Sequence, residues 1–150
     1  MKKLIIVILS MIAFAAVASA QPRAIGVRAG YGVEVSYQHY LGAENFLEAD
    51  LGLVGNHGMY LTGVYNFNIG YAGPFSFYAG PGAQAGFYAA KTSEQNVAMA
   101  LNLAVGGQIG AEWAVPSAPI NISLDWRPMF YFMHGGFGWD GFALGFRYRF

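Results

Sequence analysis

The nine residues that end the chain, residues 142–150, constrain its fold more than any other stretch. Apolar and mostly aromatic side chains alternate there with small or cationic ones, so Phe150 and Arg149 point to opposite faces. Such alternation is typical of a β-strand whose two faces meet very different surroundings. In a soluble sandwich the apolar face would be buried and the arginines exposed. The terminal strand by itself therefore does not decide which face belongs to the core.

The beginning of the chain indicates export. Lys2 and Lys3 precede an apolar run over residues 4–17, and the small residues 18–20 form a typical cleavage site. We therefore expect a signal peptide over residues 1–20 and one mature domain over residues 21–150. Because the chain contains no cysteine, disulfides cannot stabilise that exported domain.

The composition favours a membrane protein. Hydrophobic residues make up 55% of the chain and charged residues only 11%, whereas about a quarter of the residues in soluble domains are charged. After residue 20 there is no run of about 18 apolar residues that could form a transmembrane helix. Only helices and closed barrels satisfy all backbone hydrogen bonds in lipid, so we predict a barrel. The formal net charge is zero and gives no electrostatic reason to expect nucleic acid as a partner.

Glycine, proline and asparagine residues divide the mature chain into eight predicted strands. They cover approximately residues 24–30, 33–41, 45–55, 58–70, 75–89, 98–114, 119–133 and 141–150. The predicted fold class is all-β, an eight-stranded antiparallel up-and-down transmembrane β-barrel. The glycines of residues 30–32 leave open whether residues 24–41 form two strands or one kinked strand, and an even strand number favours two.

Three further expectations follow from single residue types. Pro81 and Pro128 each remove a donor from the strand ladder, so we expect bulges or unpaired positions there. The glycines of residues 80–82 and 106–107 are expected to serve backbone curvature or to leave space for large neighbours. Interfacial aromatic girdles are expected from Tyr40, Trp113, Tyr148 and Phe150 near the periplasmic ends and from Phe87 and Trp139 near the outer ends.

The polar faces of the predicted strands collect five acids and four bases. They are Arg28, Glu34, Glu48, Asp50, Glu112, Asp125, Arg127, Arg147 and Arg149. In a barrel of eight strands these side chains would fill the lumen, where buried charges have to be paired. We therefore predict a charge network that plugs the barrel and leaves no open channel. The alternative interpretation, for the subset Glu112, Asp125, Arg127, Arg147 and Arg149, is a gate for protons or solutes.

Four stretches of the mature chain carry a family resemblance, namely residues 30–39, 108–112, 123–128 and the terminal strand. With them, residues 24–150 resemble the small eight-stranded outer-membrane barrels of the OmpA/OmpX-like porin superfamily of Gram-negative bacteria. The resemblance implies an outer-membrane location, contact with outer-membrane lipid and lipopolysaccharide, and recognition of the terminal strand by the barrel-assembly machinery. The residues in the place of that assembly signal are Phe142, Leu144, Phe146, Tyr148 and Phe150.

Two constellations could indicate chemistry, and both are weak. Ser36 and His39 form the only close Ser/His pair, but an offset of three puts them on opposite faces of a strand, about 10 Å apart. His57, His134 and Asp140 lie on predicted outer loops and could form a metal-ligand set, although their spacing matches no signature. We expect solvated loop residues there, with no catalytic, metal or cofactor site.

The sequence predicts a monomeric outer-membrane barrel with a plugged polar interior and a structural or surface-interaction role, and not an enzyme. A narrow channel for small solutes is the alternative, and a lipid-modifying outer-membrane enzyme is the third interpretation. A channel needs small inner side chains along its whole length, whereas Arg and Glu are predicted to cluster in the periplasmic half.

Overall fold

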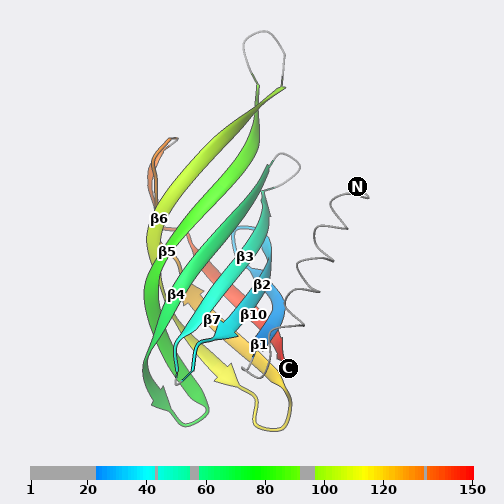
Figure 1. The fold of residues 1–150 in the computed structure, drawn as a ribbon, viewed down its shortest axis with the longest axis vertical. Helices are drawn as coiled ribbons and strands as arrows, with labels where there is room; N and C mark the ends of the chain where they lie inside the picture. Colours follow the sequence, from blue (N-terminus) through cyan, green and yellow to red (C-terminus); the bar gives the residue numbers. More distant parts are fainter. Residues whose placement is uncertain (1–22, 43, 55–57, 92–96, 134) are drawn as a thin grey trace.

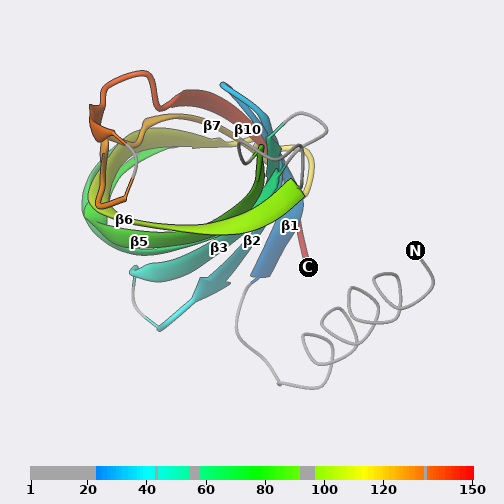
Figure 2. The same cartoon turned by 90° about the horizontal axis from the view of Figure 1, so that it is seen from above.

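A computed structural model describes residues 23–42, 44–54, 58–91, 97–133 and 135–150. These residues form one antiparallel sheet that closes into a barrel (Figures 1 and 2). The strands are β1 (Arg23–Ala29), β2 (Val33–Tyr40), β3 (Phe46–Val54), β4 (Gly58–Ala72), β5 (Phe75–Lys91), β6 (Val97–Ala114), β7 (Ile120–Trp126), β8 (Met129–Tyr131), β9 (Gly136–Gly138) and β10 (Phe142–Arg149). The predicted signal peptide lies outside the described residues. No helix among these residues is long and apolar enough to span a bilayer.

The ten segments make eight barrel strands. Both β7 and β8 pair with β6 in one continuous register, with Trp126 opposite Ile109 and Met129 opposite Gly106. They are therefore two halves of the seventh barrel strand. In the same way β9 pairs with β8 and β10 pairs with β7, so β9 and β10 supply the eighth. The β1–β10 pairing closes the ring, and the predicted all-β eight-stranded antiparallel barrel is confirmed.

The first two strands settle the ambiguity over residues 24–41. β1 and β2 are separate strands that pair antiparallel from Arg23 opposite His39 to Ala29 opposite Val33. The chain therefore turns at residues 30–32, where the amide of Gly30 donates to the carbonyl of Gly32 at 2.9 Å. The turn gives the barrel its even strand number.

The two ends of the barrel differ in height. We call the end that holds the C-terminus and the turns at residues 41–45, 73–74 and 115–119 the terminus end, and the opposite one the loop end. β5 and β6 are 17 and 18 residues long, against 7 and 8 residues for β1 and β2. One side of the wall therefore rises well beyond the other at the loop end (Figure 1).

Both prolines interrupt pairing. The register is unchanged across Pro81, whereas across Pro128 it is kept toward β6 but shifts by one residue between the β7–β10 and β8–β9 pairings. Beside Pro81, pairing between β4 and β5 stops after Val64 with Gly82 and resumes at Phe67 with Ala79. Pro128 lies in the break between β7 and β8. The expected unpaired positions are therefore found at both prolines. The one irregular step between β4 and β5 lies at residues 68–70 and was not predicted.

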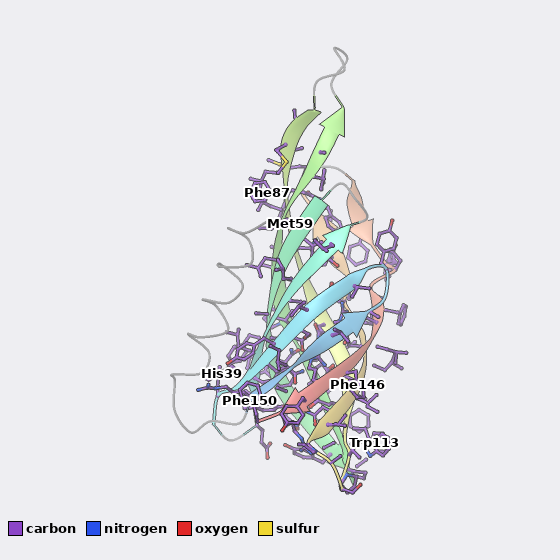
Figure 3. The ribbon with its side chains drawn as sticks, turned by 90° about the vertical axis from the view of Figure 1, so that its right-hand side faces the viewer. His39, Met59, Phe87, Trp113, Phe146 and Phe150 are labelled. Carbon is purple, nitrogen blue, oxygen red and sulfur yellow. The ribbon has the colours of Figure 1, made fainter. Side chains whose placement is uncertain are left out.

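Burial in this barrel is the inverse of that in a soluble domain. Phe142, Leu144, Phe146, Tyr148 and Phe150 point outward and are between 52% and 61% exposed. Figure 3 shows outward side chains along the whole height of the wall. The fully buried side chains, by contrast, are mostly polar and point into the lumen. An exposed apolar surface this continuous indicates an apolar surrounding medium.

Exposed aromatic side chains lie near both ends of the wall, with one correction to the expected set. Trp113 stacks on Phe75 near the terminus end, with ring centroids 6.2 Å apart, and Trp139 is 66% exposed near the loop end. Tyr40 does not belong to a girdle, because its hydroxyl donates to Glu112 inside the lumen at 3.0 Å. Tyr40 has the same parity as the inward-pointing, even-numbered residues of β2. The alternation pattern therefore indicates an inward side chain, and the assignment of Tyr40 to a girdle was wrong.

Candidate functional site in the barrel lumen

Alternation along the strands sends polar side chains from opposite walls into one narrow lumen, where three arginines organise them. Arg28 on β1 is the first. Its Nε donates to Asp125 Oδ1 at 2.9 Å, its Nη2 contacts the same carboxylate, and its Nη1 donates to Glu34 Oε2 at 2.8 Å. Glu34 is the direct register partner of Arg28, whereas Asp125 reaches it from β7. All three residues are at most 5% exposed.

Arg127, in the break between β7 and β8, is the second centre. Its Nη2 donates to Glu48 Oε1 at 2.8 Å and to Asp50, and its Nε donates to Gln108 Oε1 at 2.7 Å. Its Nη1 lies 3.5 Å from Glu34 Oε2. One guanidinium therefore meets three carboxylates that come from β2 and β3.

Arg147 on β10 is the third centre, and it is fully buried. Its Nε donates to Ser36 Oγ at 2.8 Å and its Nη1 to Ser123 Oγ at 2.7 Å. Its Nη2 lies 3.2 Å from Glu48 Oε1, and Nη1 lies 3.9 Å from Glu112 Oε2. Glu48 thus joins this centre to Arg127, as Glu34 joins Arg127 to Arg28.

Arg149 is the one predicted network residue that the structure places elsewhere. Its Nη2 donates to the carbonyl oxygens of Val115 and Ala118, at 3.4 and 3.1 Å, in the turn between β6 and β7. It shares the inward parity of Arg147 but lies too near the end of the barrel for an ion pair with the described carboxylates. Its contacts tie the end of the last strand to that turn.

The structure therefore brings eight of the nine predicted charges into one connected set, which we call the lumenal network. Its members are Arg28, Glu34, Glu48, Asp50, Glu112, Asp125, Arg127 and Arg147. The set holds five carboxylates and three guanidinium groups, so negative charges exceed positive ones by two. Charges in a low-dielectric interior need compensation, so hydrogen-bond donors on uncharged side chains have to compensate the two excess negative charges.

Neutral side chains provide these donors, and sequence reasoning did not include them in the network. Tyr60 donates to Glu34 Oε1 at 2.7 Å, and Gln38 donates to Glu48 Oε2 at 3.0 Å. At the terminus end Asn121 donates to Glu112 Oε1 at 2.9 Å. These residues could have been recognised from the sequence, because each of them lies on the polar, inward-facing side of its strand. Charge alone was too narrow a criterion.

Inner-face glycines make room for this packing. A Cβ on Gly110 would lie 2.6 Å from the ring of buried Tyr78, and one on Gly145 would lie 2.2 Å from Ser123 Oγ. At Gly80 and Gly106 the obstacle is instead a backbone carbonyl oxygen of the adjacent strand, at 1.7 and 2.0 Å. The expected space for neighbouring side chains is found at Gly82, where a Cβ would lie 2.9 Å from Val64 Cγ2, and at Gly106, where it would lie 2.8 Å from Met129 Sδ. Other inner-face glycines leave such space as well.

The two weak chemical constellations gain no support from the geometry. Ser36 is fully buried in the lumen against Arg147, whereas His39 lies on the other face, with Nδ1 3.3 Å from the hydroxyl of Tyr37. Of the suggested metal set only Asp140 is described, because residues 57 and 134 lie outside the described part. Within that part, no three His, Cys, Asp or Glu side chains are grouped to hold a metal ion.

A closed eight-stranded antiparallel barrel with an apolar exterior and a charge-paired lumen has the architecture of a small transmembrane β-barrel. No protein-family model matches the sequence, and a search of curated proteins gives no match. The N-terminal β-barrel domain of OprF from Pseudomonas aeruginosa superposes with a TM-score of 0.57 at 15% identity, over 87% of this chain and 96% of that one. This likeness establishes the fold of small outer-membrane barrels, and the OmpA/OmpX-like resemblance is confirmed as a resemblance of fold.

Two further solved structures are similar over most of their length. Neisserial surface protein A has a TM-score of 0.47 at 10% identity, with 86% of this chain and 90% of that one covered. The Yersinia pestis outer membrane protein Ail has a TM-score of 0.46 at 14% identity, with 87% and 98% covered.

Proposed function

We propose that this protein is an outer-membrane β-barrel of a Gram-negative bacterium with a plugged polar interior and a structural or surface-interaction role in the envelope. In this proposal the signal peptide of residues 1–20 directs export and is removed. The terminus end faces the periplasm and the loop end faces outward. The barrel is a monomer that contacts outer-membrane lipid and lipopolysaccharide, and it has no nucleic-acid partner.

The observation that carries the membrane location is the inverted burial. The described wall exposes Val, Leu, Ile and Phe side chains while it buries Arg, Glu and Asp. A strand such as β3, with 9 residues, covers roughly 23 Å at about 3.3 Å per residue and a tilt near 40°. That height is close to the apolar band of about 25 Å in outer-membrane barrels.

Support for the plug comes from side chains that cross the lumen. Arg147, Glu48, Gln38 and Tyr78 are each 0% exposed, although they point toward the barrel axis. Arg127 spans from the seventh strand to carboxylates on β2 and β3. Eight strands leave an interior that side chains can just fill, so we infer that water has no continuous path through it.

Planar-bilayer recording of the refolded protein tests the plug against the narrow-channel alternative. We expect no steady current from the wild type, because the lumenal network blocks the path. Leu124→Ala changes a side chain on the outer wall and is the matched control for Arg127→Ala. It should also carry no steady current. A steady wild-type current that Arg127→Ala leaves unaltered would contradict the plug.

Localisation and the absence of enzymatic activity have separate tests. The protein should fractionate with the outer membrane and migrate differently on a gel before and after heating. Cells with and without it should have the same lipid A profile, since Ser36 is fully buried against Arg147 and His39 lies on the other face of the strand. A modified lipid A that appears only in its presence would favour the enzyme interpretation.

A further inference from the structure

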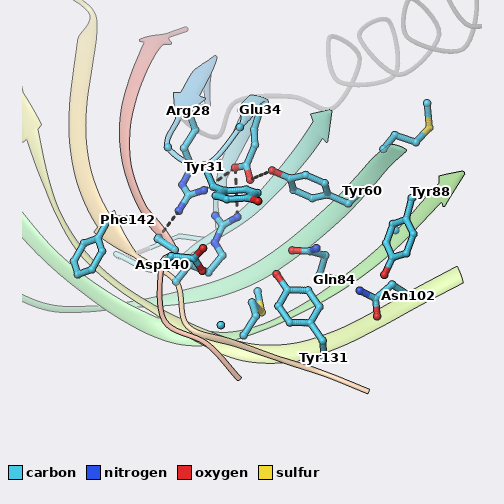
Figure 4. A pocket seen from close by; sticks show the side chains of 18 residues that line it. Arg28, Tyr31, Glu34, Tyr60, Gln84, Tyr88, Asn102, Tyr131, Asp140 and Phe142 are labelled. Atoms are coloured by element: carbon cyan, nitrogen blue, oxygen red, sulfur yellow. Dashed lines mark hydrogen bonds and ion pairs between the residues drawn. The ribbon is translucent and has the colours of Figure 1, made fainter. Parts of the chain in front are cut away.

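A cavity of about 310 Å³ opens at the loop end of the lumen, above the lumenal network. Arg28 and Glu34 form its floor (Figure 4), together with Arg127, which also lines the cavity and lies 3.5 Å from Glu34. The higher walls of β4, β5 and β6, together with β8, surround it on one side. The cavity thus exists because these strands rise beyond the β1–β2 turn. It is distinct in chemistry from the ion pairs below it.

The wall of this cavity carries tyrosines and amides, together with Met59, Met129 and several glycines. Tyr60, Tyr88, Tyr131, Gln84 and Asn102 come from four neighbouring strand segments and converge there (Figure 4). A tyrosine presents both an apolar ring and a hydroxyl group, while a primary amide both donates and accepts hydrogen bonds. This combination suits a ligand that carries hydroxyl groups on an otherwise apolar skeleton.

Some of these polar atoms are already engaged, and one is not. Tyr60 donates to Glu34, and Thr62 donates to Gln84 Oε1 at 3.2 Å. Asn102 is only 9% exposed, and its Oδ1 has no hydrogen-bond partner among the described residues. Buried polar atoms are rarely left unsatisfied. Rotation of this amide would present either of its polar atoms to a molecule in the cavity.

The charges around the cavity do not select an ion. Arg28 and Arg127 are balanced by Glu34 and Asp140, and the three floor residues are already paired with one another or with the network below. The volume lies at the lower limit of small-molecule sites, which span about 300–1,000 Å³. A neutral, compact and hydroxyl-rich ligand therefore fits better than an anion, a cation or a long chain.

We propose that the loop-end cavity binds one or two units of a neutral saccharide, with Asn102 and Gln84 hydrogen-bonding its hydroxyl groups and the tyrosine rings packing against its C–H faces. The saccharide is either free in solution or carried on lipopolysaccharide, since both present the same chemistry at this end. This inference goes beyond the envelope role. Saccharide binding is measured on the refolded protein, so its test does not depend on where the protein lies in the cell.

NMR of the refolded, isotope-labelled barrel tests the proposal through the side-chain amide signals of Asn102 and Gln84. One arm titrates glucose, galactose, N-acetylglucosamine, maltose and lactose up to about 100 mM, which covers weak millimolar sites. The other arm compares nanodiscs that contain lipopolysaccharide with nanodiscs of phosphatidylglycerol. A saturable shift of these signals in either arm supports the proposal, and the arm identifies the source.

Matched variants separate binding from folding. Asn102→Ala should weaken the saccharide response at least fivefold. Asn66→Ala should not, because Asn66 is also buried in the lumen, at 0% exposure against 9% for Asn102, but does not line the cavity. If Asn102→Ala fails to refold, Asn102→Ser and Tyr131→Ala provide the same comparison.

Three results would overturn the proposal. The first is silence of both amide signals in both arms. The second is a saccharide response that the Asn102 and Tyr131 variants leave unchanged. The third is a response to tetramethylammonium or inorganic phosphate without one to any saccharide.

Discussion

Removal of Arg127 should destabilise the barrel more than removal of any arginine outside the lumenal network. Its guanidinium is 4% exposed and contacts Glu48, Asp50 and Glu34, so Arg127→Ala leaves five carboxylates in the lumen with two guanidinium groups. Breaking a buried ion pair by deleting one partner costs about 3 to 5 kcal/mol, because the other charge stays buried without compensation. We expect a loss in the free energy of unfolding of that order for Arg127→Ala.

The measurement is reversible urea unfolding of the protein in lipid vesicles, followed by tryptophan fluorescence. Arg149→Ala is the matched control, because its side chain donates to the carbonyl oxygens of Val115 and Ala118. Loss of such hydrogen bonds should cost about 0.5 to 1.5 kcal/mol. Arg127→Met keeps most of the apolar stem and should be nearly as destabilising as Arg127→Ala, because the missing charge dominates.

A double-mutant cycle identifies the cause of the loss. If Arg127 acts by compensating buried carboxylates, Asp50→Asn should recover part of the stability that Arg127→Ala removes, with a coupling energy of about 0.5 to 3 kcal/mol. Additive losses in the double variant, or an Arg127→Ala loss no larger than that of Arg149→Ala, would refute this account of the lumenal network.

Three other substitutions probe the wall, its assembly and its inner packing. Leu124→Arg places a charge on the outer face at roughly mid-depth, where Leu124 is 56% exposed beside Leu144. It should lower the free energy of unfolding in vesicles by about 2 to 4 kcal/mol. A neutral effect would mean that this face does not contact lipid. Deletion of Phe150 should reduce outer-membrane insertion in cells, measured by fractionation, but leave refolding in detergent largely intact; normal insertion would argue against its role as an assembly signal. Gly110→Val should lower the yield of heat-modifiable barrel, because a Cβ there would lie 2.6 Å from the Tyr78 ring. Tyr78→Ala in the same chain should restore the yield, and a yield that stays low would contradict this account of the packing.

Much of the architecture could be predicted from local sequence because a strand alternates its side chains whatever its neighbours are. Residues 142–150 illustrate this, since the large apolar side chains at the even-numbered positions are all exposed, whereas Ala143 and Arg147 are buried. Most strand limits were also close to those observed, because turn residues mark them. The exception is the eighth barrel strand, which was predicted to begin at residue 141, whereas β9 already supplies residues 136–138. The error at Tyr40 arose when an aromatic side chain was assigned by type although its position on β2 placed it inward.

The candidate site could be predicted only as a set of inward charges. Arg28 meets Asp125 across 97 residues, and Arg127 meets Glu48 across 79. Which inward groups meet depends on strand order around the ring, on register and on the reach of each side chain. Arg147 and Arg149 share one face, yet only Arg147 lies deep enough to join the network.

The sequence by itself determined that this chain forms strands, approximately where most of them begin and end, and which face of each is apolar, because these properties depend on near neighbours in the chain. Only the tertiary structure decided how the inner charges pair, which glycines accommodate large side chains, and that the tall walls of β4, β5 and β6 enclose a cavity above Arg28 and Arg127. Closure of the barrel creates these features, since it brings together residues whose separation in sequence carries no record of their contact.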